Sequence, residues 1–137
     1  SDVYKRQVKN AVPPGKSPVP GIRSLSSNAR YAMIIVDKET FEAEVQQSSM
    51  PCVVDLWGPQ CGPCLALMPE VEKLAEAYEG KLKFCKLNVA ENRRLVISLR
   101  VMAVPTILFY KGGECVARIS GDAVSIEAIK AEADKLV

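Results

Sequence analysis

The chain has 137 residues, of which 48% are apolar and 25% charged, which is typical of one soluble globular domain with a hydrophobic core. Its net charge of +2, without a basic cluster, gives no support to nucleic-acid binding, and no apolar run approaches the roughly 20 residues of a membrane helix. The absence of histidine excludes Ser–His and Cys–His catalysis and removes the commonest metal ligand.

Residues 1–32 differ in composition from the rest of the chain. Residues 12–21 contain four prolines and two glycines, and residues 24–28 are small and polar. Because no periodicity indicates a helix or strand there, we expect a disordered or loosely docked arm before a single domain at residues 33–137. No apolar stretch of the kind found in signal peptides is present in this arm.

The first half of the domain predicts two strands and two helices. Residues 33–36 are an apolar run typical of a strand, and Asp37 is suited to cap a helix to about residue 47, with Phe41 and Val45 on its buried face. Residues 51–56 predict a buried strand. The helix after it has apolar residues at 67, 71, 74, 75 and 78, contains Pro69, which should kink its axis, and ends at Gly80.

The second half predicts three strands and two helices. Residues 82–89 indicate a strand, and residues 91–99 a short helix that buries Leu95, Val96 and Leu99. Residues 106–110 and 115–120 predict a hairpin whose turn contains two glycines, which supply positive φ. Residues 125–136 predict a closing helix. This alternating order indicates an α/β fold, in which helices cover both faces of a sheet.

Two cysteines lie where the second strand ends and the next helix begins. The first turn of a helix has unpaired N–H groups and the positive end of the helix dipole, so the pKa of Cys61 should fall below the free value of about 8.5. Cys64 follows roughly one turn later, close enough to form a disulfide, and should be less exposed. We therefore predict that Cys61 is the nucleophile and Cys64 the resolving thiol. Structural zinc would need four ligands, so we expect no metal.

The other three cysteines, Cys52, Cys85 and Cys115, stand alone in apolar or strand-like surroundings. We expect each to be a small buried hydrophobic side chain. Five cysteines cannot all pair within one chain, and the lack of a disulfide framework fits a reducing compartment such as the cytoplasm.

Asp55 interrupts the apolar strand at residues 51–56. A buried carboxylate costs several kcal/mol unless it is paired or protonated, so its pKa should rise towards the range of a general base at neutral pH. The alternative is a structural acid satisfied by Lys86 or by backbone groups.

The Cys-Gly-Pro-Cys sequence at residues 61–64, after Asp55 and Trp57 and before Val104-Pro105-Thr106, resembles the thioredoxin family. The likeness covers about residues 33–137 and includes residues 86–89, the turn at 111–114 and Gly121. It implies the thioredoxin fold, a central five-stranded mixed sheet in the order 1-3-2-4-5 flanked by four helices, with the first three strands parallel and the hairpin antiparallel.

The resemblance also implies roles around the cysteines. Asp55 would exchange protons with Cys64, and Lys86 on the neighbouring strand would tune Asp55, although Lys86 could equally be a solvated charge. Trp57 would pack beside the disulfide. Pro105 would be cis and face the cysteines, with the Val104 backbone offered to an extended substrate.

The surface around Cys61 is expected to be flat and uncharged, with Gly62, Pro63 and Gly121 among its residues. Gln60 stands where common family members have a second tryptophan, which should change partner choice. Gly-Pro between the cysteines resembles the reducing members, for which about −270 mV is typical.

These features predict a monomeric protein-disulfide reductase that needs no bound cofactor. Its partners would be disulfide-containing client proteins and, by resemblance, a thioredoxin reductase, with no nucleic acid and no membrane. The alternatives are an extracytoplasmic thiol oxidant or isomerase, and a binding module whose cysteines are dispensable.

Overall fold

The structure is a computed structural model that describes residues 33–137, so the arm predicted at residues 1–32 lies outside the described residues. Within that part of the chain, no helix is both long and apolar enough to cross a membrane. The elements, in chain order, are β1 (Met33–Val36), η5 (Glu42–Gln46), β2 (Cys52–Trp57), α2 (Gly62–Ala77), β3 (Lys83–Asn88), η6 (Val89–Glu91), α3 (Arg93–Ser98), β4 (Thr106–Lys111), β5 (Glu114–Ser120), η7 (Gly121–Ala123) and α4 (Ile126–Asp134).

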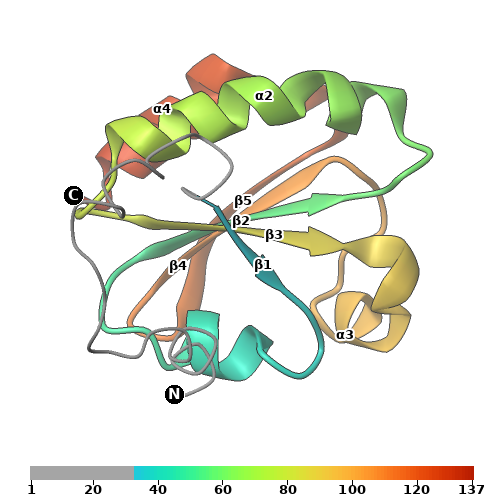
Figure 1. Cartoon of the computed structure of the whole chain (residues 1–137), viewed down its shortest axis with the longest axis horizontal. Helices are drawn as coiled ribbons and strands as arrows, with labels where there is room; N and C mark the ends of the chain where they lie inside the picture. Colours follow the sequence, from blue (N-terminus) through green and yellow to red (C-terminus); the bar gives the residue numbers. More distant parts are fainter. Residues whose placement is uncertain (1–32) are drawn as a thin grey trace, which may run out of the picture.

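The five strands form one mixed sheet in the order β1-β3-β2-β4-β5. Strands β1 and β2 each pair parallel with β3, whereas β4 pairs antiparallel with both β2 and β5. Helices α2 and α4 cover one face of the sheet, and η5 and α3 lie on the other (Figure 1). The predicted fold, strand order and strand directions are therefore confirmed.

The core has two parts because the central strands are buried on both faces, as expected for strands between helix layers. Along β2, Val53 packs with the cluster under α2 and α4, and its neighbour Val54 packs with the cluster under η5 and α3. The same alternation separates Phe84 from Cys85 in β3. The buried apolar residues of these strands therefore pack alternately under one helix layer and the other.

The helix predicted after β1 has a different form. The Asp37 carboxylate accepts hydrogen bonds from the N–H groups of Glu39 and Thr40, at 2.9 and 3.0 Å, and so stabilises a turn. A π-helix, η5, follows, in which the Gln47 N–H donates to the Glu42 carbonyl five residues earlier, at 2.9 Å. Phe41 and Val45 are buried on this segment, as predicted.

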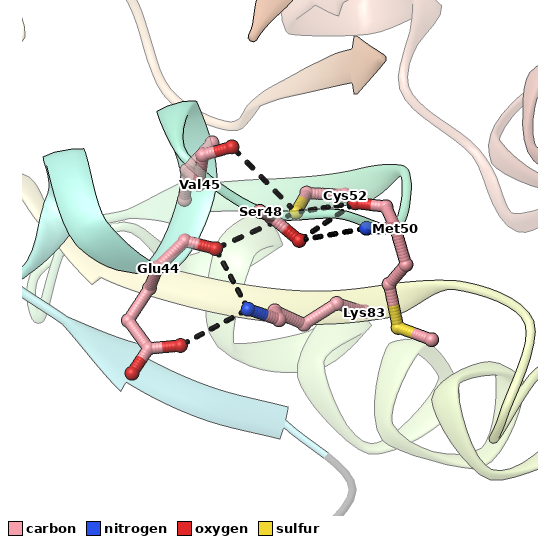
Figure 2. A network of polar contacts seen from close by, with 6 residues as sticks. All are labelled: Glu44, Val45, Ser48, Met50, Cys52 and Lys83. Atoms are coloured by element: carbon pink, nitrogen blue, oxygen red, sulfur yellow. Dashed lines mark hydrogen bonds and ion pairs between the residues drawn. The ribbon is translucent and has the colours of Figure 1, made fainter. Parts of the chain in front are cut away.

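Side chains from two strands hold the carbonyls of η5 (Figure 2). The Lys83 Nζ donates to the Glu44 carbonyl at 2.8 Å and forms an ion pair with the Glu44 carboxylate at 3.1 Å. The Cys52 thiol lies 3.7 Å from the same carbonyl and 4.0 Å from that of Val45. These partners satisfy carbonyls that a regular α-helix would pair with its own later N–H groups.

The three isolated cysteines differ in burial. Cys52 and Cys85 are buried, as predicted, and burial raises the pKa of both thiols. The prediction for Cys115 is wrong, because this side chain is exposed. It lies on β5, an edge strand with no fully buried residue, whose sequence nevertheless contains several apolar side chains.

Candidate active site

The cysteine pair lies at the junction of β2 and α2. Cys61 occupies the N-cap position of α2, where its Sγ accepts a hydrogen bond from the Cys64 N–H at 3.2 Å. The two residues form a disulfide, with their Cα atoms 5.3 Å apart. Cys61 is partly exposed, whereas Cys64 is 1% exposed. Their positions and relative exposure therefore agree with those predicted from the sequence.

Three segments converge around Gly58, the residue that follows β2. A Cβ atom added to Gly58 would lie 3.6 Å from the side chain of Val89, 3.8 Å from the Cys61 Cβ and 3.9 Å from the side chain of Val104. The loop after β3 and the loop before β4 are thus close to Cys61.

The loop before β4 contains the cis peptide bond Val104–Pro105, as the resemblance implied. The hydroxyl of Thr106, a buried residue, donates to the Ala103 carbonyl at 2.6 Å, and the Gly121 N–H donates to the Pro105 carbonyl at 2.9 Å. Among the hydrogen bonds of residues 33–137, none involves the N–H or C=O of Val104. These two bonds hold the loop on either side of Val104.

An open groove of about 850 Å³ passes in front of Cys61. Its lining consists of residues 58–63 and 101–104 together with Val89, Ala90, Arg93, Val96 and Ile97. The predicted site residues among them are Gln60, Cys61, Gly62, Pro63 and Val104. Trp57, Pro105 and Gly121 do not line it. Trp57 is partly buried at the end of β2, and its packing beside the disulfide stays a prediction.

The expectation of a flat, uncharged surface is wrong. The surface is hollowed, and Arg93 is the one charged residue among the described residues that line it. Ile97 and Met102, which are 71% and 93% exposed, also line the groove and were not predicted. The sequence could have indicated Ile97, because it is an apolar residue that lies beside the predicted buried face of its helix.

Asp55 lies on the face of the sheet that α2 covers and is 2% exposed. Neither of its carboxylate oxygens has a hydrogen-bond partner among residues 33–137. Desolvation by burial raises the pKa of Asp55 to about 7, and the positive charge of Lys86 opposes this rise. The alternative of a carboxylate hydrogen-bonded by Lys86 or by backbone groups is therefore contradicted.

Lys86 is the direct neighbour of Asp55 in β3, but its ammonium binds elsewhere. Its Nζ forms an ion pair with Glu72 of α2 at 3.3 Å. Both side chains are about one-fifth exposed, with 19% for Lys86 and 20% for Glu72. Lys86 is therefore a paired, half-buried cation rather than a fully solvated one. Glu72 was not predicted as part of the site, because nothing in its local sequence distinguishes it from other helix-surface acids.

A cysteine pair at a helix N-terminus, beside a groove and shortly after a strand that carries a buried acid, is typical of a thiol–disulfide exchange protein. The family model "Thioredoxin" matches residues 32–135. The thioredoxin of Peptoclostridium acidaminophilum is 43% identical over 99 residues, which cover 72% of this chain and 90% of that protein. Thioredoxin 1 of a Nostoc species is 40% identical over 86 residues, or 63% of this chain and 80% of that protein. Chloroplastic thioredoxin M5 of rice, Oryza sativa subsp. japonica, is 30% identical over 114 residues, or 83% of this chain and 66% of that protein.

The chain belongs to the thioredoxin family. Proteins of this family are thiol–disulfide oxidoreductases that use their own cysteine pair without a bound cofactor, and this chain is a thiol–disulfide reductase. Within the described residues, no group of three or more potential ligand side chains could hold a metal ion.

Proposed function

We propose that Cys61 attacks disulfides of client proteins and that Cys64 resolves the resulting mixed disulfide. The Cys61 thiolate displaces one client sulfur as a thiolate and forms a Cys61–client disulfide. Cys64 then bonds to the Cys61 Sγ, and the second client sulfur leaves with the electron pair of the broken bond. The client gains two electrons and the protein is left with the Cys61–Cys64 disulfide. The observation that carries this assignment is the partial exposure of Cys61 above a buried Cys64.

Asp55 is the proposed proton acceptor for Cys64. The Cys64 thiol must lose its proton before it can attack, and a general base works best when its pKa lies near the working pH. Support comes from the buried, unpaired state of Asp55 and from its pKa of about 7. Lys86 is the proposed modulator of this acid, because its positive charge favours the ionised form.

The client segment is proposed to lie in the groove beside Cys61. The unpaired N–H and C=O of Val104 would bind its backbone as an added strand does. The apolar side chains of Ile97 and Met102 would contact its side chains. Gln60, Gly62 and Pro63 would contact it next to Cys61. Trp57, Pro105 and Gly121 would support this surface from outside the groove.

The proposed setting is the cytoplasm, where a reducing environment keeps the pair as thiols. A thioredoxin reductase is the family's electron donor and would return two electrons to the Cys61–Cys64 disulfide after each turnover. We propose that the protein acts as a monomer.

Reduction of insulin disulfides, together with trapping, tests these assignments. Cys64→Ser should retain client proteins from a cell extract as mixed disulfides on Cys61, because the resolving step is lost. Cys61→Ser should retain none, and both variants should lose insulin reduction. Retention of clients by Cys61→Ser alone would reverse the two roles, and insulin reduction by the double Cys→Ser variant would refute them.

A further inference from the structure

The Asp55 carboxyl has a lysine next to it in the sheet, yet it has no hydrogen-bond partner among the described residues. Lys86 is its cross-strand neighbour, on a flexible stem that carries three N–H donors. An ammonium in that place would ordinarily bind a buried carboxylate, since both groups lose solvation otherwise. The structure shows instead that the ammonium pairs with Glu72, while both Asp55 oxygens stay unpaired among the described residues.

The groups around Asp55 explain why the Lys86 ammonium pairs with Glu72 and not with Asp55. On the same face of the sheet, β3 contributes Lys86 and β4 contributes the uncharged Ile107, and Glu72 of α2 reaches the Lys86 ammonium. Cys64 is bonded to Cys61 and carries no charge. Glu72 is therefore the one acid on α2 that binds the Lys86 ammonium, at a place where both side chains keep some contact with water.

We propose that Glu72 is a positioning residue, which holds the Lys86 ammonium away from the Asp55 carboxyl and so controls how readily that carboxyl gives up its proton. Without the Glu72 carboxylate, Lys86 would be free to turn to Asp55, and an adjacent opposite charge favours the ionised acid. Glu72 would thus set the pH at which Asp55 exchanges its proton, through Lys86 and without contact with the cysteines. This inference rests on the proposed function for its effect on the reaction, but not for its effect on Asp55.

The test is a titration of the Asp55 carboxyl carbon by NMR in the disulfide form, in which neither Cys61 nor Cys64 titrates. Glu72→Gln should lower the Asp55 midpoint by about one pH unit or more. The matched control is Glu70→Gln, which makes the same charge change at an exposed position on the same helix and should leave the midpoint in place. An unchanged midpoint in Glu72→Gln would overturn the proposal.

A double-variant cycle shows whether Glu72 acts through Lys86. Lys86→Met should raise the Asp55 midpoint, and in that background Glu72→Gln should have less than half of its effect in the parent protein. Equal effects in both backgrounds would contradict the proposal, since they would mean a direct charge effect of Glu72.

The pH dependence of insulin reduction separates this proposal from the role of Asp55. If Glu72→Gln lowers the titration midpoint and shifts the activity profile to lower pH by a similar amount, both assignments are supported. If the midpoint falls while the profile stays unchanged, Glu72 still positions Lys86, but Asp55 is not the proton acceptor.

Discussion

Asp55 shows how one residue can lower stability in order to serve a site. A protonated carboxyl is easier to bury than a carboxylate, so the folded protein holds the Asp55 proton up to about pH 7, whereas the ordinary value is 3.8. Between these values the folded state binds more protons than the unfolded state. The stability that the folded state gains from holding this proton is therefore fully present below about pH 4 and is lost as the pH rises through 7.

Replacement of this acid by a neutral amide should remove the pH dependence. Asp55→Asn should become more stable relative to the parent protein by roughly 4 kcal/mol between about pH 4 and pH 7, at about 1.4 kcal/mol for each pH unit that separates the two pKa values. Urea unfolding at a series of pH values measures this difference. Asp122→Asn, at an exposed position, is the control, and parallel pH curves for Asp55→Asn and the parent would contradict the account.

The Cys61 thiol should ionise near neutral pH in the reduced protein. Its sulfur accepts the Cys64 N–H and lies at the positive end of a 16-residue helix, both of which stabilise the thiolate. We expect its pKa to be below about 8.5, measured by thiolate absorbance in a Cys115→Ser background that removes the exposed thiol. A thiol that is still protonated above that pH would remove the basis for Cys61 as the attacking group.

Residues whose role follows from local sequence were predictable, and residues that act through partners distant in sequence were not. Cys61 and Cys64 flank a strand–helix junction, and Asp55 interrupts an apolar run, so each has a signal in its own neighbourhood. Glu72 matters through an ion pair with a residue 14 positions away, and Arg93 through its place in the groove. Neither the ion pair of Glu72 nor the place of Arg93 in the groove can be recognised from the residues next to them in the sequence.

Among the elements, the five strands and three α-helices follow from apolar periodicity and from turn residues. Gly112 and Gly113 have the positive φ values, 63° and 84°, that their turn was predicted to need. The π-helical form of η5 could not be predicted, because its carbonyls are held by Cys52 and Lys83 from the strands. A local helical pattern carries no information about such partners.

The attachment of η5 to the sheet should depend on Lys83. Lys83→Met removes the donor to the Glu44 carbonyl and leaves the Glu44 carboxylate, a 7% exposed residue, without its ion-pair partner. We expect a loss of about 2 kcal/mol in the free energy of unfolding, measured with urea. Lys81→Met, at an exposed position, should change it little. An equal effect of both substitutions would show that the network in Figure 2 adds no stability.

At the scale of the whole molecule, the site lies beyond the carboxyl ends of β2 and β3, where crevices form in open α/β sheets. The fold class was predictable from the alternating order of the elements. The strand order was predictable only through the resemblance to the thioredoxin family. The groove was not predictable from the sequence, because segments after β2, after β3 and before β4 form it together. Its hollow shape depends on how those segments pack around Gly58.

The central claim is that this assembly acts as a reductant, and the reduction potential of the Cys61–Cys64 pair tests it most directly. Equilibration with glutathione or a reference dithiol, followed by quantification of the two redox forms, gives the value. The account predicts a potential near about −270 mV, as in reducing members of the family. A value between about −180 and −120 mV would contradict it, because such a pair oxidises the thiols of its partners.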